Sequence, residues 1–136
     1  MDSTIGIVDL DASTPKFTPI TKPAMWATYP DWHPTDDRIV FSTRPWTELP
    51  DGPSRLYTIR PDGSELTPLT PADDPARAVQ PSWTPDGTSV VFTRVIGTGF
   101  GNPAIATILG DGSLLGPATG NGWQFGTHPR LRPTTP

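Results

Sequence analysis

Two histidines, His33 and His128, are the side chains best suited to metal binding or proton transfer in this sequence. His33 lies between Trp32 and Pro34, where the second copy of an internal repeat has Thr84, so we expect a structural role for it. His128 has no acidic neighbour close in sequence, and we expect the same of it. A zinc site needs three or four converging ligands, and the chain has no cysteine. The sequence therefore predicts no metal site and no cofactor.

The acidic pairs Asp36-Asp37 and Asp73-Asp74 are the next candidates, as parts of a calcium site or a catalytic carboxylate pair. Neither pair has the ligand spacing of a calcium loop. Aspartate at turns commonly caps the backbone, and this is the role we expect here. Three further aspartates each precede a glycine, which is the signal of a tight turn: Asp62, Asp86 and Asp111.

Residues 97–101, GTGFG, suggest a phosphate-binding loop. The segment lacks the spacing of the dinucleotide fingerprint and the Lys-Ser/Thr of a P-loop, and Asn102-Pro103 follows it instead of a helix start. We therefore expect an ordinary loop. The chain also has no Gly-x-Ser-x-Gly motif, and we predict that it has no catalytic residues and is not an enzyme.

Four aromatic residues lie in segments expected to be connections or loops, and they are the candidate partner-binding residues. Aromatic side chains in loops on a rigid scaffold are common contact residues of binding modules. The alternative is that they fill gaps between neighbouring structural units. Trp32 and Trp83, in contrast, occupy matching positions of the repeat, and we expect them in the core. The four candidates are Trp26, Trp46, Trp123 and Phe125.

These residues are positioned by a repeat centred on residues 79–94, VQPSWTPDGTSVVFTR. An earlier copy, TYPDWHPTDDRIVFSTR, occupies residues 28–44, and its Trp32 and Phe41 stand 51 positions before Trp83 and Phe92. Within this copy, residues 39–41 are apolar at consecutive positions. A strand has that pattern when both faces of its sheet are covered.

Each period of about 50 residues holds four short strands separated by turns, which is typical of a β-propeller blade. The predicted fold is all-β: a partial β-propeller of about two complete four-stranded blades with partial blades at each end. Residues 1–136 form a single domain. Within it, residues 1–21 are the back half of a blade, 22–70 and 71–119 are blades, and 120–136 are a connection and the first strand of a further blade.

Composition limits the function classes. The chain has 136 residues and a net charge of −4, with no clustered basic face of the kind that binds nucleic acid. No apolar run approaches the roughly 18 residues of a membrane span. The 19 prolines and 13 glycines fall at repeated positions between short apolar runs, which favours turns between strands over disorder.

The repeat resembles that of TolB-like β-propellers. The resemblance rests on PSWTPDG at residues 81–87, VVF at 90–92, YTIRPDG at 57–63 and LT at 69–70, and it covers residues 5–133. It is specific for the repeat and not for a function, since such repeats occur in periplasmic TolB, in sensor and surface proteins, and in propellers fused to α/β-hydrolase peptidases. The resemblance implies an arc of a propeller and a periplasmic or extracellular location.

We therefore expect a non-catalytic interaction or scaffold module with a protein partner, from a longer protein. The alternative is part of the gating propeller of a prolyl-oligopeptidase-type serine peptidase. Because an open arc leaves apolar sheet faces and strand edges uncovered, we also expect self-association or the presence of additional blades.

Overall fold

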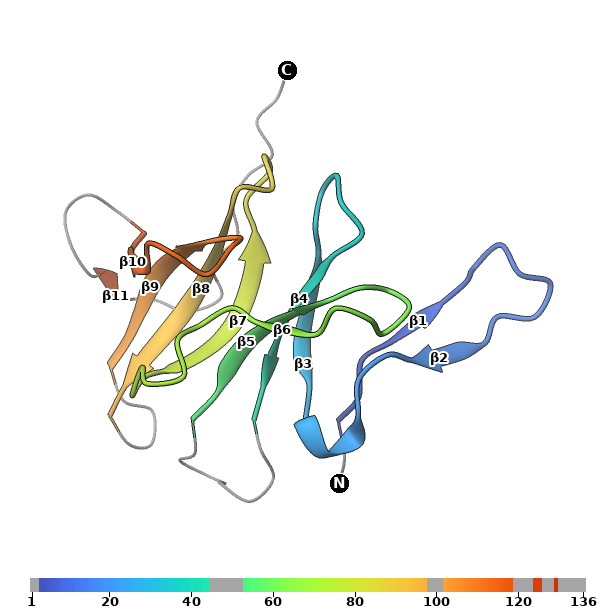
Figure 1. The fold of residues 1–136 in the computed structure, drawn as a ribbon, viewed down its shortest axis with the longest axis horizontal. Helices are drawn as coiled ribbons and strands as arrows, with labels where there is room; N and C mark the ends of the chain where they lie inside the picture. The colour runs from blue at the N-terminus through green and yellow to red at the C-terminus, as the bar shows by residue number, and fades with distance from the viewer. Residues whose placement is uncertain (1–2, 45–52, 98–101, 119–123, 126–128, 130–136) are drawn as a thin grey trace.

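The computed structural model describes residues 3–44, 53–97, 102–118, 124–125 and 129. Their strands form three antiparallel sheets that follow one another in chain order (Figure 1). The first is a hairpin of β1 (Gly6–Val8) and β2 (Phe17–Pro19). The first blade has the order β3 (Thr28–Trp32), β4 (Ile39–Thr43), β5 (Arg55–Ile59) and β6 (Thr67–Pro68). The second blade repeats it with β7 (Arg77–Trp83), β8 (Ser89–Ile96), β9 (Asn102–Leu109) and β10 (Gly116–Pro117).

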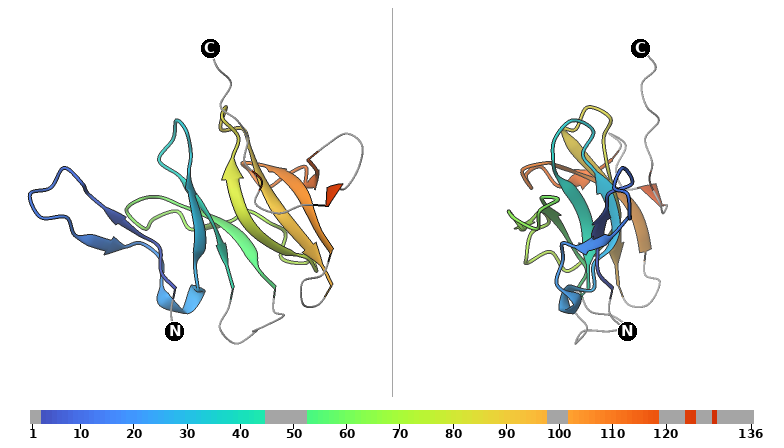
Figure 2. Two further views of the ribbon diagram at one scale, coloured as in Figure 1. Left: turned by 180° about the vertical axis from the view of Figure 1, so that it is seen from behind. Right: turned by 90° about the vertical axis from the view of Figure 1, so that its right-hand side faces the viewer.

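The sheets stand side by side like the blades of a fan (Figure 2). A short 3-10 turn, η1 (Pro23–Met25), leads from the hairpin into the first blade. The described residues contain no α-helix. The structure is thus all-β and has the architecture of a partial β-propeller, as the sequence predicted.

Strand β4 shows why the sequence is apolar at consecutive positions. All five of its residues are buried. Val40 joins a cluster between the two blades, whereas Ile39 and Phe41 join a second cluster that faces the hairpin. Because both faces of the first blade are covered, neighbouring positions of the strand must both be apolar. The prediction of a two-sided strand is confirmed.

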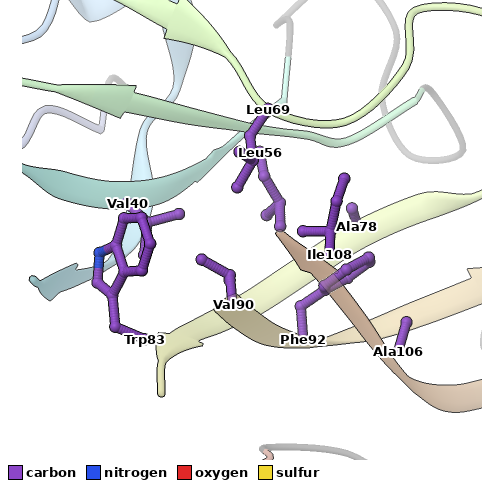
Figure 3. Close-up of a cluster of buried hydrophobic side chains, with 9 residues drawn as sticks. All are labelled: Val40, Leu56, Leu69, Ala78, Trp83, Val90, Phe92, Ala106 and Ile108. Atoms are coloured by element: carbon purple, nitrogen blue, oxygen red, sulfur yellow. The ribbon is translucent and has the colours of Figure 1, made fainter. Parts of the chain in front are cut away.

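The cluster between the blades is the larger core (Figure 3). Leu56 and Leu69 of the first blade meet Phe92 and Ile108 of the second. Strand β7 of the second blade packs against β3, β4 and β5 of the first. The first strand of the second blade is therefore the element that joins the blades. The whole cluster comprises Val40, Leu56, Leu69, Ala78, Trp83, Val90, Phe92, Ala106 and Ile108.

The repeat extends to backbone conformation. Tyr29 and Gln80, 51 positions apart, both have a left-handed φ, of 54° and 57°. Each stands in a β-bulge, where the register of the first strand shifts against the second. Glu65 and Leu114 likewise share a left-handed φ before the fourth strands. The two blades are thus copies at the level of individual residues.

The ends of the blades differ from the sequence expectation. The fourth strands, β6 and β10, have only two residues each. The connection expected from residue 120 onward contains a short strand, β11 (Gln124–Phe125). It pairs with β9 at Ile105 and Ala104, beside the stretch that β10 occupies. Because β10 covers only part of that edge of β9, hydrogen-bonding groups remain there for β11 to pair with.

Candidate binding site

The junction of the two blades is built around Trp83, at the end of β7. Its side chain is 5% exposed. The His33 ring meets the indole edge to face at a centroid distance of 4.6 Å, and the Arg38 guanidinium carbon lies 5.3 Å from the indole centroid. Both residues belong to the turn region between β3 and β4. The turn of one blade therefore covers the tryptophan of the next.

His33 is buried and both of its ring nitrogens have partners. Nδ1 accepts hydrogen bonds from the backbone N–H groups of Thr35 and Asp36, at 3.2 and 2.9 Å. Nε2 therefore carries the proton and donates to the carbonyl oxygen of Gly87, at 3.0 Å. The side chain thus caps its own turn and ties it to the turn of the next blade. This agrees with the structural role expected for His33; His128 lies outside the described residues.

Asp31 is a second link between the blades, and sequence reasoning missed it. Its Oδ2 accepts hydrogen bonds from the backbone N–H of Trp83 at 2.7 Å and from the Ser82 hydroxyl at 3.1 Å. Asp31 and Ser82 hold the same position in successive repeats. A carboxylate beside a hydroxyl at equivalent positions is the signal in the sequence from which this contact could have been inferred.

Trp32 does not lie in the core, and the prediction that it matches Trp83 in burial was wrong. It is 48% exposed. Trp83 is covered by His33 and Arg38 of the preceding blade, whereas no histidine or arginine among the described residues covers Trp32 in this way. A groove of about 330 Å³ remains there, which we call the Trp32 groove. Its lining comprises Ile5, Gly6, Ile7, Val8, Pro30, Asp31, Trp32 and Ile39.

The first acidic pair forms a partly exposed ionic cluster. Asp36 accepts a hydrogen bond from Nε of Arg38 at 2.7 Å and lies 3.7 Å from a guanidinium nitrogen of Arg60. The hydrogen bond from Arg38 is the main reason that the pKa of Asp36 lies below its usual value. The carboxylate thus holds Arg38 beside the face of Trp83.

In the second acidic pair, Asp73-Asp74, it is Asp74 that makes the structural contacts. Its carboxylate binds Arg94 through two nitrogens, at 2.6 and 3.1 Å, and accepts the backbone N–H of Ala76 at 3.0 Å. Burial by itself raises the pKa of Asp74, but these hydrogen bonds and the positive charges of Arg94 and Arg55 outweigh it and lower the pKa. The ion pair between Asp74 and Arg94 thus ties the segment before β7 to strand β8.

The aspartates before glycine cap their turns. The Asp62 and Asp111 carboxylates each accept the backbone N–H of the serine two residues later, at 2.9 Å, and Asp86 accepts that of Thr88 at 3.1 Å. Hydroxyl hydrogen bonds from Ser64, Thr84 and Ser113 are the main reason that the pKa values of the three carboxyls lie below their usual range. Within the described ranges, no three His, Asp or Glu side chains gather in a way that would hold a metal ion.

Of the four aromatic candidates, Trp26 has a described side chain. It is half-buried, follows η1 with a left-handed φ of 45°, and lines a second pocket of about 260 Å³ between the blades. Phe125 stands in β11. Trp46 and Trp123 lie outside the described residues, as does most of the glycine-rich loop. Among the helical segments that the structure describes, none is long and apolar enough to span a membrane.

This chain resembles known proteins in its three-dimensional structure. No family model matches the chain, and no curated protein matches it by sequence. A TolB-type protein from Agrobacterium tumefaciens superposes with a TM-score of 0.63 and 23% identity, over 81% of this chain and 39% of that one. An oligogalacturonate lyase solved with manganese superposes with a TM-score of 0.54 and 20% identity, over 74% of this chain and 26% of that one.

The chain therefore spans about two fifths and about one quarter of the lengths of these two β-propellers. At these levels of identity the likeness concerns the fold alone. In fold, this chain is a partial β-propeller of the kind found in TolB.

Proposed function

We propose that the chain is a non-catalytic interaction module and that it binds a blade of its own repeat type through the Trp32 groove. The exposure of Trp32 carries the proposal: it is 48% exposed, whereas its counterpart Trp83 is 5% exposed beneath the turn of the preceding blade. The groove also has further apolar surface, because Val8 on its rim is 44% exposed. Burying such surface is the main favourable term in protein association.

The cover of Trp83 indicates the chemistry of the partner. Trp83 contacts the imidazole ring of His33 and the guanidinium group of Arg38, and its backbone N–H donates a hydrogen bond to the carboxylate of Asp31. The two tryptophans occupy equivalent strand ends, so an equivalent surface fits Trp32. That surface is the turn between the first two strands of a TolB-like blade, from a second copy of this chain or from further repeats of the same protein.

Sedimentation velocity tests the proposal. We expect the 136-residue chain to self-associate at tens of micromolar, and Trp32→Ser to shift the distribution toward monomer. Leu10→Ser is the matched control, because Leu10 is more exposed than Trp32 but does not line the groove. An equal effect of both substitutions contradicts the proposed surface, and a chain that stays monomeric excludes a second copy as the source of the partner blade.

The non-catalytic part is tested separately. We expect no turnover of peptide or ester substrates by the purified chain, and none of oligogalacturonate, the substrate named for one structural neighbour. The chain covers a quarter of that enzyme's length, and no recognisable arrangement of nucleophile, base and oxyanion donors occurs in its sequence. Turnover that a point substitution within the chain abolishes would overturn the reading.

A further inference from the structure

The second pocket, of about 260 Å³, lies between the end of β4 and the first strands of both blades. We call it the Arg44 pocket, because Arg44 is the only charged side chain among the described residues that line it. Trp26 and the half-exposed Tyr29 supply aromatic surface to the same pocket. The described residues that line it are Trp26, Thr28, Tyr29, Ser42, Thr43, Arg44, Ser54 and Val79.

Two hydrogen-bond donors of this pocket are buried without an acceptor among the residues that the structure describes. The Ser42 side chain is 1% exposed, and its Oγ has no partner among the described residues. Nε of Arg44 is likewise buried and unpaired there. A buried polar group without a partner costs stability, and such groups in a native structure call for an explanation.

The second blade shows what is missing. Thr93 stands 51 positions after Ser42, and its hydroxyl donates to Oε1 of Gln80 at 3.0 Å. In the first blade the position of Gln80 is taken by Tyr29, which has no comparable acceptor. The same bulge that satisfies the hydroxyl in the second blade therefore leaves the Ser42 hydroxyl unpaired.

From this arrangement we propose that the Arg44 pocket binds a small carboxylate carried on a six-membered ring. The carboxylate accepts hydrogen bonds from the Arg44 guanidinium, which matches carboxylate geometry, and from the Ser42 hydroxyl, which rotates freely. The ring lies against Trp26 and Tyr29. Because the pocket is smaller than the roughly 300–1,000 Å³ of drug-sized sites, the ligand is a single ring rather than a polymer. An aromatic acid and a sugar acid share this chemistry.

Titration of the labelled chain with benzoate and with glucuronate, followed by amide NMR shifts, tests the proposal. We expect saturable shifts at residues 28, 42 and 44 with at least one of the two, and a Kd of about 1 mM or tighter. The ligand that binds more tightly identifies the ring. Absence of saturation with both, equal shifts with neutral benzyl alcohol, or tighter binding of inorganic phosphate overturns the proposal.

Variants separate binding from folding. Arg44→Gln should weaken binding at least tenfold. Ser42→Ala should weaken it about threefold without lowering Tm, because it removes an unpaired hydroxyl. The matched control Thr93→Ala removes a paired hydroxyl, so it should lower Tm and leave the affinity unchanged. Affinity that is unchanged in Arg44→Gln, or an equal loss in Ser42→Ala and Thr93→Ala, contradicts the site.

A fourth variant keeps the test decisive if Arg44→Gln does not fold. Tyr29→Gln gives Ser42 the acceptor that Thr93 has in the second blade. We expect it to raise Tm and to weaken carboxylate binding, since the hydroxyl is then occupied and the Tyr29 ring no longer supports the ligand. A lower Tm together with unchanged affinity would show that the Ser42 hydroxyl is not a ligand-binding group.

Discussion

Replacing Trp83 by alanine should cost far more stability than the same change at Trp32, although the two residues have nearly the same local sequence. Removing a buried tryptophan costs about 3–5 kcal/mol. Trp83 is 5% exposed and adds the contacts with His33 and Arg38, which contribute about 0.5–1.5 and 0.5–1 kcal/mol. Its Nε1 is buried without a partner among the described residues, a cost of about 1–3 kcal/mol that the substitution relieves. The expected net loss is about 4 kcal/mol.

Trp32 buries about half as much of its side chain, so Trp32→Ala should cost about 2 kcal/mol. Urea unfolding is followed by far-UV circular dichroism, because the substitutions alter tryptophan fluorescence. With a slope of about 1.5 kcal/mol per molar urea, the midpoints should fall by roughly 2.5 M for Trp83→Ala and roughly 1.3 M for Trp32→Ala. Equal shifts would refute the argument that the turn of one blade stabilises the tryptophan of the next.

Two further predictions concern contacts around the second blade. Gly87→Ala should lower the free energy of unfolding by about 1–3 kcal/mol, because Gly87 has a φ of 69° and an added Cβ would lie 2.5 Å from Nε2 of His33. The control Gly116→Ala, with open space around it, should change stability by about 0.5 kcal/mol or less. Thermal unfolding compares the two variants, and equal effects would contradict the close contact between the turns. Asp74→Asn should lower the free energy of unfolding by about 2–3 kcal/mol at pH 7. Because folding lowers the pKa of Asp74, the stability it contributes is fully present above its unfolded pKa of 3.8 and is lost as the pH falls through its folded pKa. Urea unfolding should therefore show a smaller stability difference between wild type and variant at pH 3 than at pH 7, and the same difference at both would argue against the ion pair.

The sequence by itself determined the blades, because their signals are local or strictly periodic. Proline and glycine mark the turns, and apolar residues at consecutive positions 39–41 show that both faces of β4 are covered. The 51-residue offset of Trp32 and Trp83 sets the period of the first two strands. Each of these features depends on neighbours in sequence or on the next copy, so a single sequence was sufficient to predict them.

The candidate site was predictable in part. The structural role of His33 followed from its place in the repeat, but its bond to the carbonyl of Gly87 did not, because backbone partners leave no trace in side-chain identity. The link from Asp31 to Trp83 was missed for a similar reason, since the acceptor serves a backbone N–H in another blade.

Only the tertiary structure decided which equivalent residues behave alike. Trp32 and Trp83 share their sequence context, yet one is exposed and the other buried, because burial depends on the blade that precedes each. Ser42 and Thr93 are both buried hydroxyl residues at matching positions, yet Thr93 has an acceptor and Ser42 does not, because the residue across the bulge differs. A repeat specifies the conformation of each copy, but packing and hydrogen-bond satisfaction depend on groups outside that copy, which only the assembled blades bring together.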